Sequence, residues 1–278
     1  MVSFPNCKIN LGLSILRKRT DGYHDLSTVF YPLPVKDILE IIHTPTPIHT
    51  PTPSPTPAFT AYGIPIPGDS TSNLCEKAYR LLKADFPTLP TVHIHLYKNI
   101  PIGAGLGGGS ADGAFTLLAL NKKFQLNLDT QRLLHYAAQL GSDCPFFILN
   151  TPCLGGGRGE QLTPIPLDLG AYSFVLVNPG IHIGTAQAFS GCTPREDNIS
   201  LPDILQQPVA TWPQHLTNDF EGPVFQLHPE LREIKTTLYA CGALYASLTG
   251  SGSSFYGIFE KHNTPASLPL SWNYRILP

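Results

Sequence analysis

Charged side chains are scarce in this sequence. Lys and Arg number 18 and Asp and Glu number 20 among 278 residues, so the formal net charge is only -2, and no run of basic residues is longer than the three at 17–19. A protein that binds a nucleic acid backbone needs clustered positive charge. The composition therefore argues against a nucleic acid partner.

Long hydrophobic runs are also absent, although 42% of the residues are hydrophobic. No stretch approaches the roughly 18 apolar residues of a membrane span, and the N-terminus lacks the apolar run of a signal peptide. The six cysteines form no C-x-x-C pair. We therefore expect a globular protein with no membrane partner, whose cysteines are reduced, mostly buried thiols in a cytoplasm. The cysteines are Cys7, Cys75, Cys144, Cys153, Cys192 and Cys241.

Hydrophobic periodicity indicates a mixture of strands and helices. In residues 6–16 the apolar side chains alternate with Lys8, Asn10, Gly12 and Ser14, which predicts a half-buried strand. Strands and helices do not alternate strictly along the chain, so we expect an α+β fold and not a doubly wound sheet. Further strands are predicted at 37–42, 91–97, 172–178 and 253–259, and helices at 72–83, 111–124, 129–140 and 229–239.

Two histidine patterns raise the question of a metal site. Residues 43–57 contain the unit HTPTP twice and are rich in proline, which removes backbone donors and predicts an extended, polyproline-like surface excursion. A metal-binding or partner-docking tract is the alternative, and a connecting loop is preferred. His93 and His95 share a strand face at a two-ligand spacing, but no third ligand is near in sequence, so simple strand filling is favoured.

The glycine-rich stretch PIGAGLGGGSAD occupies residues 101–112, between a predicted strand and a predicted helix. It contains a formal G-x-G-x-x-G, but a dinucleotide fold needs an acidic residue about 20 positions further on, and the first one beyond the helix is Asp129. A Walker loop needs a lysine after the glycines, and none follows. What remains is a nest of backbone amides at a helix N-terminus that suits a di- or triphosphate, with Ser110 as N-cap or as a phosphate and metal contact. Glycines that serve only tight packing are the alternative.

Four other motifs occur with this stretch in a fixed order: PNCKINL at 5–11, GYH at 22–24, GSDCPFF at 141–147 and TGSG at 249–252. Together the five resemble the GHMP small-molecule kinases over nearly the whole chain. Within that family the combination is most similar to members that act on a cytidine diphosphate methylerythritol in the non-mevalonate route to isoprenoids. The resemblance implies an enzyme that uses ATP and Mg²⁺ to phosphorylate the 2-hydroxyl of that small molecule.

Two residues match catalytic groups of this family. The resemblance implies that Asp143 accepts the proton of the acceptor hydroxyl and that Lys8 stabilises charge on the acceptor and γ-phosphoryl oxygens. Because phosphoryl transfer has a loose transition state, positioning and electrostatics are expected to contribute more than proton removal. Taken singly, Asp143 is equally well explained as a helix N-cap, and Lys8 as a strand lysine that extends toward solvent.

The same resemblance implies the binding residues. His24 is expected to stack on the cytosine and Phe189 to close the other side, while Asn10, Tyr23 and Thr185 contact the substrate. Taken singly, His24 is more often a turn histidine and Phe189 a core aromatic. The residues expected to bind the nucleotide are Asn73, Leu74, Lys98, Pro101, Gly103, Gly105, Leu106, Gly107, Gly108, Gly109, Ser110, Thr249, Gly250, Ser251 and Gly252.

The resemblance further implies two domains. The first, residues 1–157, is expected to have the fold of ribosomal protein S5 domain 2, and the second, residues 158–278, a ferredoxin-like fold, with the glycine cluster at 155–160 as the boundary. A return of the last strand to the first domain stays open. A bacterial cytoplasmic location is expected, the metal ligands are unassigned, and the protein is either a monomer or a homodimer.

Three other functions stay open. One is a GHMP kinase that acts on a different small alcohol, which would phosphorylate a cytidine-free alcohol faster. Another is a nicotinamide-binding oxidoreductase, which a dinucleotide would protect thermally better than ATP does. The third is a non-catalytic relative that binds ATP without turnover.

Overall fold

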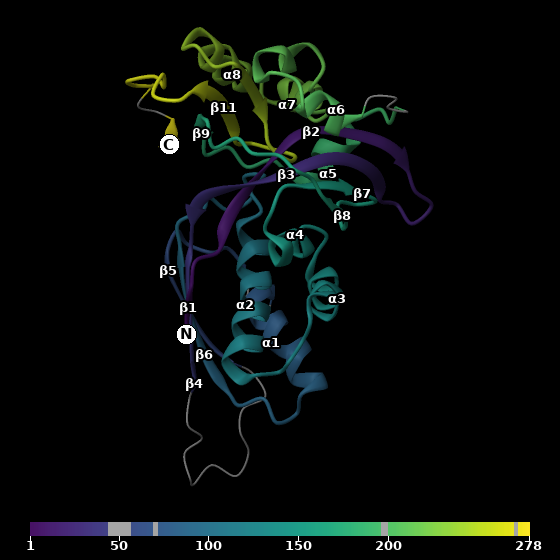
Figure 1. Cartoon of the computed structure of the whole chain (residues 1–278), viewed down its shortest axis with the longest axis vertical. Coiled ribbons are helices and arrows are strands. Elements are labelled where there is room, and N and C mark those ends of the chain that lie inside the picture. The colour runs from purple at the N-terminus through teal and green to yellow at the C-terminus, as the bar shows by residue number, and fades with distance from the viewer. Residues whose placement is uncertain (44–56, 69–71, 196–199, 270–271) are drawn as a thin grey trace. The chain divides into compact units, whose positions relative to one another are not determined.

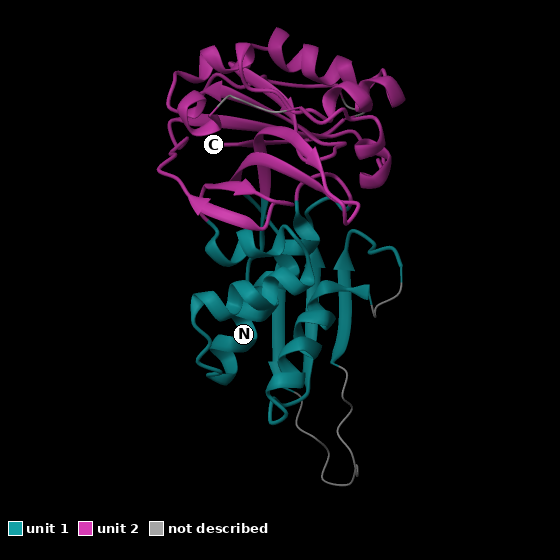
Figure 2. Cartoon of the chain, turned by 90° about the vertical axis from the view of Figure 1, so that its right-hand side faces the viewer, with its two compact units in different colours: residues 1–7, 33–102, 107–150 teal, residues 8–32, 103–106, 151–278 magenta. Residues whose placement is uncertain are grey.

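The chain divides into two compact units that interleave in sequence (Figure 2). In the computed structural model, residues 1–43, 57–68, 72–195, 200–269 and 272–278 are described (Figure 1). The polyproline-like excursion predicted at 43–57 therefore lies almost wholly outside the described residues. Unit 1 comprises residues 1–7, 33–102 and 107–150, and unit 2 comprises residues 8–32, 103–106 and 151–278.

Unit 1 contains a four-stranded sheet in the order β1-β4-β6-β5. Strand β6 (Val92–Lys98) pairs antiparallel with β4 (Ile38–His43) and parallel with β5 (Ala58–Gly63), and β4 pairs antiparallel with β1 (Val2–Ser3). The predicted period of two is confirmed in β6, because Val92, Ile94 and Leu96 are buried on one face.

The described residues of unit 1 also form the α-helices α1 (Leu74–Asp85), α2 (Gly108–Phe124), α3 (Thr130–Leu140) and α4 (Cys144–Leu149). Helix α2 lies against both α1 and β4, and its Ala111, Ala114 and Leu117 are fully buried. The side chain of Asp129 caps α3 by accepting a hydrogen bond from Arg132 N at 2.8 Å. The helices predicted from apolar spacing are thus present.

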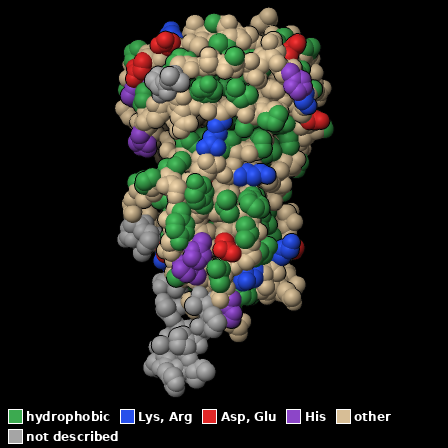
Figure 3. Space-filling model, turned by 90° about the vertical axis from the view of Figure 1, so that its left-hand side faces the viewer, with side chains coloured by type: hydrophobic (Ala, Val, Ile, Leu, Met, Phe, Trp, Pro, Cys, Tyr) green, Lys and Arg blue, Asp and Glu red, His purple; other side chains and the backbone are tan. Residues whose placement is uncertain are grey.

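The face of this sheet opposite the buried side chains of β6 carries exposed side chains. It exposes large hydrophobic side chains at Ile38, Ile42, Tyr62 and Tyr97, and hydrophobic and histidine side chains gather on the face shown in Figure 3. His93 and His95 stack there with ring centroids 3.8 Å apart, and His93 Nε2 lies 2.8 Å from Thr60 Oγ1. No group of three or more His, Cys, Asp or Glu side chains that could hold a metal ion occurs within the described part of the chain.

Unit 2 contains two sheets. One has the order β2-β3-β7-β8, and the first residues of β2 and the last of β3 belong to unit 1. The other has the order β10-β11-β9-β12, in which β9 pairs antiparallel with β11 and β12. The strands are β2 (Asn6–Lys18), β3 (His24–Lys36), β7 (Cys153–Gly156), β8 (Gln161–Pro164), β9 (Tyr172–Asn178), β10 (Tyr245–Leu248), β11 (Phe255–Glu260) and β12 (Asn273–Leu277).

The helices of unit 2 supply one side of its hydrophobic core. Leu231, Ile234 and Leu238 of α8 are buried together with Val175 of β9 and Phe255 of β11. Between the predicted strand at 172–178 and the predicted helix at 229–239, the structure has short helices, and α6 has a proline in its first turn. The helices are α5 (Thr185–Ser190), α6 (Leu201–Leu205), the 3-10 helix η2 (Val209–Gln214), α7 (Glu221–Leu227) and α8 (Leu231–Ala240).

Strand β2 differs from its prediction. The sequence predicts a half-buried strand, but every residue from Asn6 to Ile15 is buried, including the polar face with Lys8 and Asn10. The predicted alternation of apolar and polar residues is confirmed. The prediction that the strand is only half-buried was wrong, because its polar face is buried too. The polar face is covered by residues more than 200 positions away, such as Tyr256, which local periodicity does not show.

The sequence predicts a single domain boundary after residue 157. In the structure, each of the two compact units is instead made of three segments of the chain. Residues 8–32 belong with the C-terminal part of the chain because β3 pairs with β7, and Leu13 N donates to Thr217 O at 2.9 Å. The last strand, β12, pairs with β9 in unit 2. No helix of the described residues is long and apolar enough to span a membrane.

The six cysteines are free thiols in the part of the chain that the structure describes, and four of them are buried. Burial raises the pKa of Cys144 to about 12 and that of Cys153 to about 11. A thiol with a raised pKa is mostly protonated at neutral pH and is a poor nucleophile. Cysteine chemistry therefore has no support at these two positions.

Candidate active site

The polar face of β2 in unit 2 carries a buried hydrogen-bond network. Lys8 is 3% exposed and donates from Nζ to Asn10 Oδ1 at 2.6 Å, and Lys8 Nζ also lies 5.4 Å from the centroid of the Phe30 ring. Asn10 Nδ2 donates to Thr28 Oγ1 at 3.0 Å, and Thr28 in turn donates to Gly12 O. A lysine that extends toward solvent would not be buried in this way. The network fixes the Lys8 ammonium beside polar oxygens inside the unit.

The TGSG turn after β10 lies against this network. Thr249 Oγ1 accepts from Asn10 N at 3.1 Å, and the Tyr256 hydroxyl donates to Asn10 O at 2.8 Å. A Cβ added to Gly250 would lie 3.5 Å from Lys8 Nζ. Asn218 Nδ2 donates to the carbonyls of Leu248 and Gly250, both at 2.9 Å, and so holds the turn from its other side. Thr249 and Gly250, predicted to bind nucleotide, are thus brought next to Lys8.

The first part of the glycine stretch also belongs to unit 2. Gly103 and Gly105 have left-handed backbones with φ of +64° and +77°. A Cβ on Gly105 would lie 2.0 Å from Thr249 O, so the stretch approaches the TGSG turn as closely as a glycine backbone allows. Leu106 is buried, and its carbonyl accepts from Lys8 N at 3.0 Å. The glycines here therefore allow close backbone packing, in addition to any contact that they make with a ligand.

The second part of the stretch starts α2 in unit 1. The N-cap is Gly107 in a left-handed conformation, and no side chain among the described residues caps the helix. The prediction of Ser110 as N-cap was therefore wrong, because Ser110 lies inside the first turn. A Cβ on Gly109 would meet no described atom within 4 Å. First-turn amides that no side chain caps, with open space at a glycine, fit the phosphates of a nucleotide.

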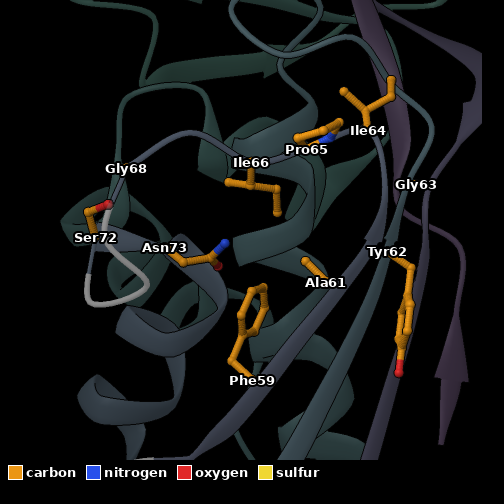
Figure 4. A pocket seen from close by; sticks show the side chains of 10 residues that line it. All are labelled: Phe59, Ala61, Tyr62, Gly63, Ile64, Pro65, Ile66, Gly68, Ser72 and Asn73. Carbon is orange, nitrogen blue, oxygen red and sulfur yellow. The ribbon is translucent and has the colours of Figure 1, made fainter.

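A pocket of about 400 Å³ lies in unit 1 beside the start of α1, within the size range of small-ligand sites. Figure 4 shows Phe59, Ile66 and Asn73 pointing toward one another across the pocket, whereas Tyr62 points away from it. Asn73 also caps α1 by accepting from Cys75 N at 2.8 Å. The lining offers an aromatic ring, an aliphatic chain and an amide, which fit a purine base. Phe59 and Ile66 were missed because β5 was not predicted.

Leu74 and Lys98, also predicted to bind the nucleotide, do not line this pocket. Leu74 packs on α2, since a Cβ on Gly113 would lie 2.9 Å from Leu74 Cβ. Lys98 is buried, and its Nζ forms ion pairs with Asp37 and Asp112. Pro101, predicted to bind the nucleotide, is half-buried just ahead of the first loop glycine.

Asp143 lies in unit 1 at the start of α4. It occupies the N-cap position with φ of -83° and ψ of -15°, yet its side chain makes no capping bond within the described residues. The N-cap explanation therefore does not account for this carboxylate. Cys144 and Phe146, which follow it, are fully buried, so the backbone that carries Asp143 is anchored in the core.

Unit 2 brings the predicted substrate aromatics together. The rings of His24 and Phe189 stack with centroids 4.7 Å apart and an angle of 13° between their planes. Thr185, at the start of α5, has its Oγ1 3.4 Å from Ser251 Oγ of the TGSG turn. Tyr23 is 55% exposed.

Arg158 was missed by the sequence analysis. Its guanidinium carbon lies 4.6 Å from the centroid of the Tyr23 ring, a cation–π contact. Arg158 N also donates to Glu160 Oε2 at 2.7 Å, which fixes the turn that carries the guanidinium. Its signal in the sequence is that it is the single basic residue inside the glycine cluster at 155–160. That cluster was interpreted only as a domain boundary.

Comparison with known proteins identifies both halves of the chain. Residues 73–151 match the model of the GHMP kinases N terminal domain, and residues 200–275 match that of the GHMP kinases C terminal domain. A curated protein of Bacteroides thetaiotaomicron named 4-diphosphocytidyl-2-C-methyl-D-erythritol kinase is 48% identical over 95% of this chain and 94% of its own length. A protein of the same name from Azobacteroides pseudotrichonymphae is 50% identical over 95% of this chain and 96% of its own.

Comparison with solved structures points to the same family. The crystal structure of a 4-(cytidine 5'-diphospho)-2C-methyl-D-erythritol kinase superposes with a TM-score of 0.76 at 32% identity, covering 93% of this chain and 90% of that one. A mevalonate kinase, at 12% identity and a TM-score of 0.65 over 99% of this chain and 98% of its own, shares the fold. The α+β class is confirmed, and the chain belongs to the GHMP kinase family, in the group whose curated members are named 4-diphosphocytidyl-2-C-methyl-D-erythritol kinase.

Proposed function

We propose that this chain phosphorylates the 2-hydroxyl of 4-diphosphocytidyl-2-C-methyl-D-erythritol with ATP, giving the 2-phosphate and ADP in the non-mevalonate isoprenoid route. The observation that carries the proposal is identity of 48–50% over 95% of the chain with curated kinases of that name. The free cysteines fit a reducing compartment, and we place the reaction in the bacterial cytoplasm. The proposed reaction is the same whether the protein is a monomer or a homodimer.

Asp143 and Lys8 act on the acceptor hydroxyl in this proposal. The Asp143 carboxylate accepts the hydroxyl proton as the oxygen bonds to the γ-phosphorus and the bond from that phosphorus to the departing ADP oxygen breaks. The Lys8 ammonium stabilises the negative charge on the transferring oxygens. What supports the Lys8 role is its burial and its bond to Asn10, because a fixed ammonium does not need to reorganise during the reaction.

Nucleotide binding falls to the glycine stretch and the pocket beside α1. The amides of Gly108, Gly109 and Ser110 bind phosphate oxygens, and the pocket at Asn73 accepts the adenine. ATP supplies the phosphoryl group, and a bound Mg²⁺ would partly neutralise its charge. Such an ion would be held largely by the phosphates and by water.

Substrate binding falls to unit 2 residues. The base stacks against His24 and Phe189, and Tyr23, Asn10 and Thr185 contact the rest of the molecule. The stack of His24 on Phe189 supports this role, because an aromatic pair near a half-exposed tyrosine suits a flat base.

A coupled assay of ADP release tests the proposed substrate. The full-length protein is mixed with Mg-ATP and either the cytidine diphosphate compound or a cytidine-free alcohol such as methylerythritol, homoserine or mevalonate. We expect kcat/KM to be highest for the cytidine diphosphate compound by at least about 100-fold, since the stacking and polar contacts of the base would be missing otherwise. A faster cytidine-free alcohol would refute the proposed substrate and leave the kinase family intact.

Replacing Asp143 by Asn tests the proposed general base. We expect kcat to fall by roughly 10²- to 10⁴-fold, because an amide accepts no proton at neutral pH. The unfolding temperature is measured beside kcat, so that a loss of the folded state is distinguished from the loss of the general base. The matched control is Asp129→Asn, whose side chain caps α3 and where Asn caps equally well, so kcat should stay near wild type. Near-normal turnover of Asp143→Asn would contradict the assigned role.

A further inference from the structure

We infer that Asp37, Lys98 and Asp112 form a buried positioning cluster that fixes both ends of the glycine stretch, so that the first-turn amides of α2 are held ready for the phosphates of ATP. The inference rests on the proposed use of ATP and adds positioning residues to it. The three residues lie in unit 1 and are at most 3% exposed.

Lys98 is the centre of the cluster. It is the last residue of β6, and its Nζ donates to Asp37 Oδ2 and, at 2.7 Å, to Asp112 Oδ2. Two ion pairs at a side chain that is 2% exposed hold the ammonium inside the protein. The Lys98 ammonium therefore acts on a ligand only through the residues it holds.

Asp37 fixes the start of the glycine stretch. Its Oδ1 accepts from Asn99 N at 2.6 Å and from Ile100 N at 2.8 Å, while Oδ2 accepts from Lys98. One carboxylate thus binds three consecutive residues, 98 to 100, immediately before the stretch begins at Pro101. The Asp37 backbone is itself held, because Asp37 N donates to Pro5 O at 2.8 Å.

Asp112 fixes the other end. It lies in α2, one turn beyond the helix start at Gly108, and binds the same Lys98 ammonium. Gly108 is pressed against this centre, since a Cβ there would lie 2.8 Å from Ile100 Cγ2 and 3.1 Å from Lys98 Nζ. Residues 98–100 and residues 108–112 are therefore bound to one ammonium, and the intervening glycines connect two fixed points.

The composition of the stretch makes such anchoring necessary. Gly103, Gly105 and Gly107 all have left-handed backbones, and glycine loses more conformational freedom on ordering than any other residue. A loop of this kind keeps one shape only if its ends are held. Because phosphate binding depends on the direction of several amides at once, a shift of the helix start would weaken nucleotide binding before it affected other steps.

The charges explain why the cluster survives burial. Two carboxylates face one ammonium, and burial raises the pKa of Asp112 well above its usual value, against the opposing effect of Lys98. Asp112 Oδ1 has no hydrogen-bond partner among the described residues, so a proton on that oxygen disturbs no other contact. The neutral acid still accepts from Lys98 through Oδ2. The remaining charges, those of Asp37 and Lys98, then form one balanced pair.

The test compares Lys98→Met, Asp112→Ala and Asp112→Asn in the full-length protein. Calorimetric titration with ADP gives Kd without any acceptor, and steady-state assays give kcat and both KM values. We expect Lys98→Met and Asp112→Ala to raise the Kd for ADP by about 10- to 100-fold, with kcat at saturating ATP and the KM of the alcohol changing less than about threefold. Asp112→Asn, which retains the oxygen that accepts from Lys98, should recover most of the loss.

The matched control is Tyr136→Phe. The Tyr136 hydroxyl donates to Asp85 Oδ2 at 2.5 Å within the same unit, so its loss lowers stability without touching the cluster. Circular dichroism and unfolding temperature identify the folded variants, and if Lys98→Met does not fold, the two Asp112 variants, which keep the Lys98–Asp37 pair, carry the test. Folded cluster variants with wild-type Kd for ADP, or with equal rises in both KM values, would overturn the inference. Failure of the wild type to phosphorylate the cytidine compound would refute only the proposed function.

Discussion

Asn10 shows why some site residues need one particular side chain. Its amide group accepts from Lys8 Nζ through Oδ1 and donates to Thr28 through Nδ2, so it needs an acceptor and a donor at once. An aspartate would lose the donor and add a negative charge beside the Lys8 ammonium. In the proposed reaction, the neutral amide would leave the positive charge of Lys8 available to the transferring phosphoryl group.

At the same scale, Asp112 predicts an unusual pH dependence. Burial raises its pKa in the folded protein, so the folded state keeps a proton that the unfolded state has already lost. Stability therefore falls as pH rises from the unfolded pKa toward the folded one. Compared with Asp112→Asn, the wild type should lose unfolding temperature as the pH rises above the ordinary range of an aspartate pKa. Thermal melts of both proteins over a series of pH values measure this, and a difference that does not change with pH would contradict it.

At the scale of elements, the glycine turns are defined by what they touch. Gly105 and Gly22 both have a positive φ in unit 2, of +77° and +86°, but only at Gly105 would a Cβ collide, 2.0 Å from Thr249 O. At Gly22 no described atom lies within 4 Å of that position. The two glycines separate the cost of a left-handed backbone from the cost of a lost close approach.

This contrast yields a measurable difference. Gly22→Ala should cost about 1–2 kcal/mol, the backbone penalty alone, and Gly105→Ala about 1–3 kcal/mol more, because the TGSG turn must move. Urea unfolding of the two variants gives both free energies. Equal losses of unfolding free energy in the two variants would contradict this prediction. They would show that the backbone at Gly105 can move away from Thr249 without a cost in stability.

Periodicity predicted nine of the described elements, because their apolar spacing is set locally: β2, β4, β6, β9, β11, α1, α2, α3 and α8. It did not predict β5, whose AFTAYG sequence follows a proline-rich segment. Nor did it show that the polar face of β2 is buried or that Lys98 faces two carboxylates. Asp37 is 61 residues and Asp112 14 residues from Lys98, and side-chain direction depends on the packing of both.

At the scale of the whole chain, unit 2 is assembled from distant segments. Residues 8–32 are held by the C-terminal part, since Ile15 N donates to Asp219 Oδ2 at 2.8 Å and Tyr256 bonds Asn10 O. A cut at the glycine cluster therefore does not separate two independent folds, although the two family models cover separate stretches of sequence.

Expression of residues 1–157 alone tests this view. The fragment keeps β2 but loses Thr217, Thr249 and Tyr256, so its buried polar face loses the partners that cover it, and we expect no cooperative unfolding transition. Co-expression with residues 158–278 should restore one. Calorimetry of the fragment and of the co-expressed pair measures both, and a sharp transition in residues 1–157 alone would show that β2 is stable without unit 2.

The stack of His24 on Phe189 has a consequence for affinity. Each ring already shields one face of the other from water. A base that intercalates between them forms two ring contacts but breaks one, so its net gain is close to a single stacking interaction, about 1–3 kcal/mol. If the proposed substrate binds here, discrimination among pyrimidines would depend mainly on hydrogen bonds at the base edge, since pyrimidine rings of similar size gain similar amounts from stacking.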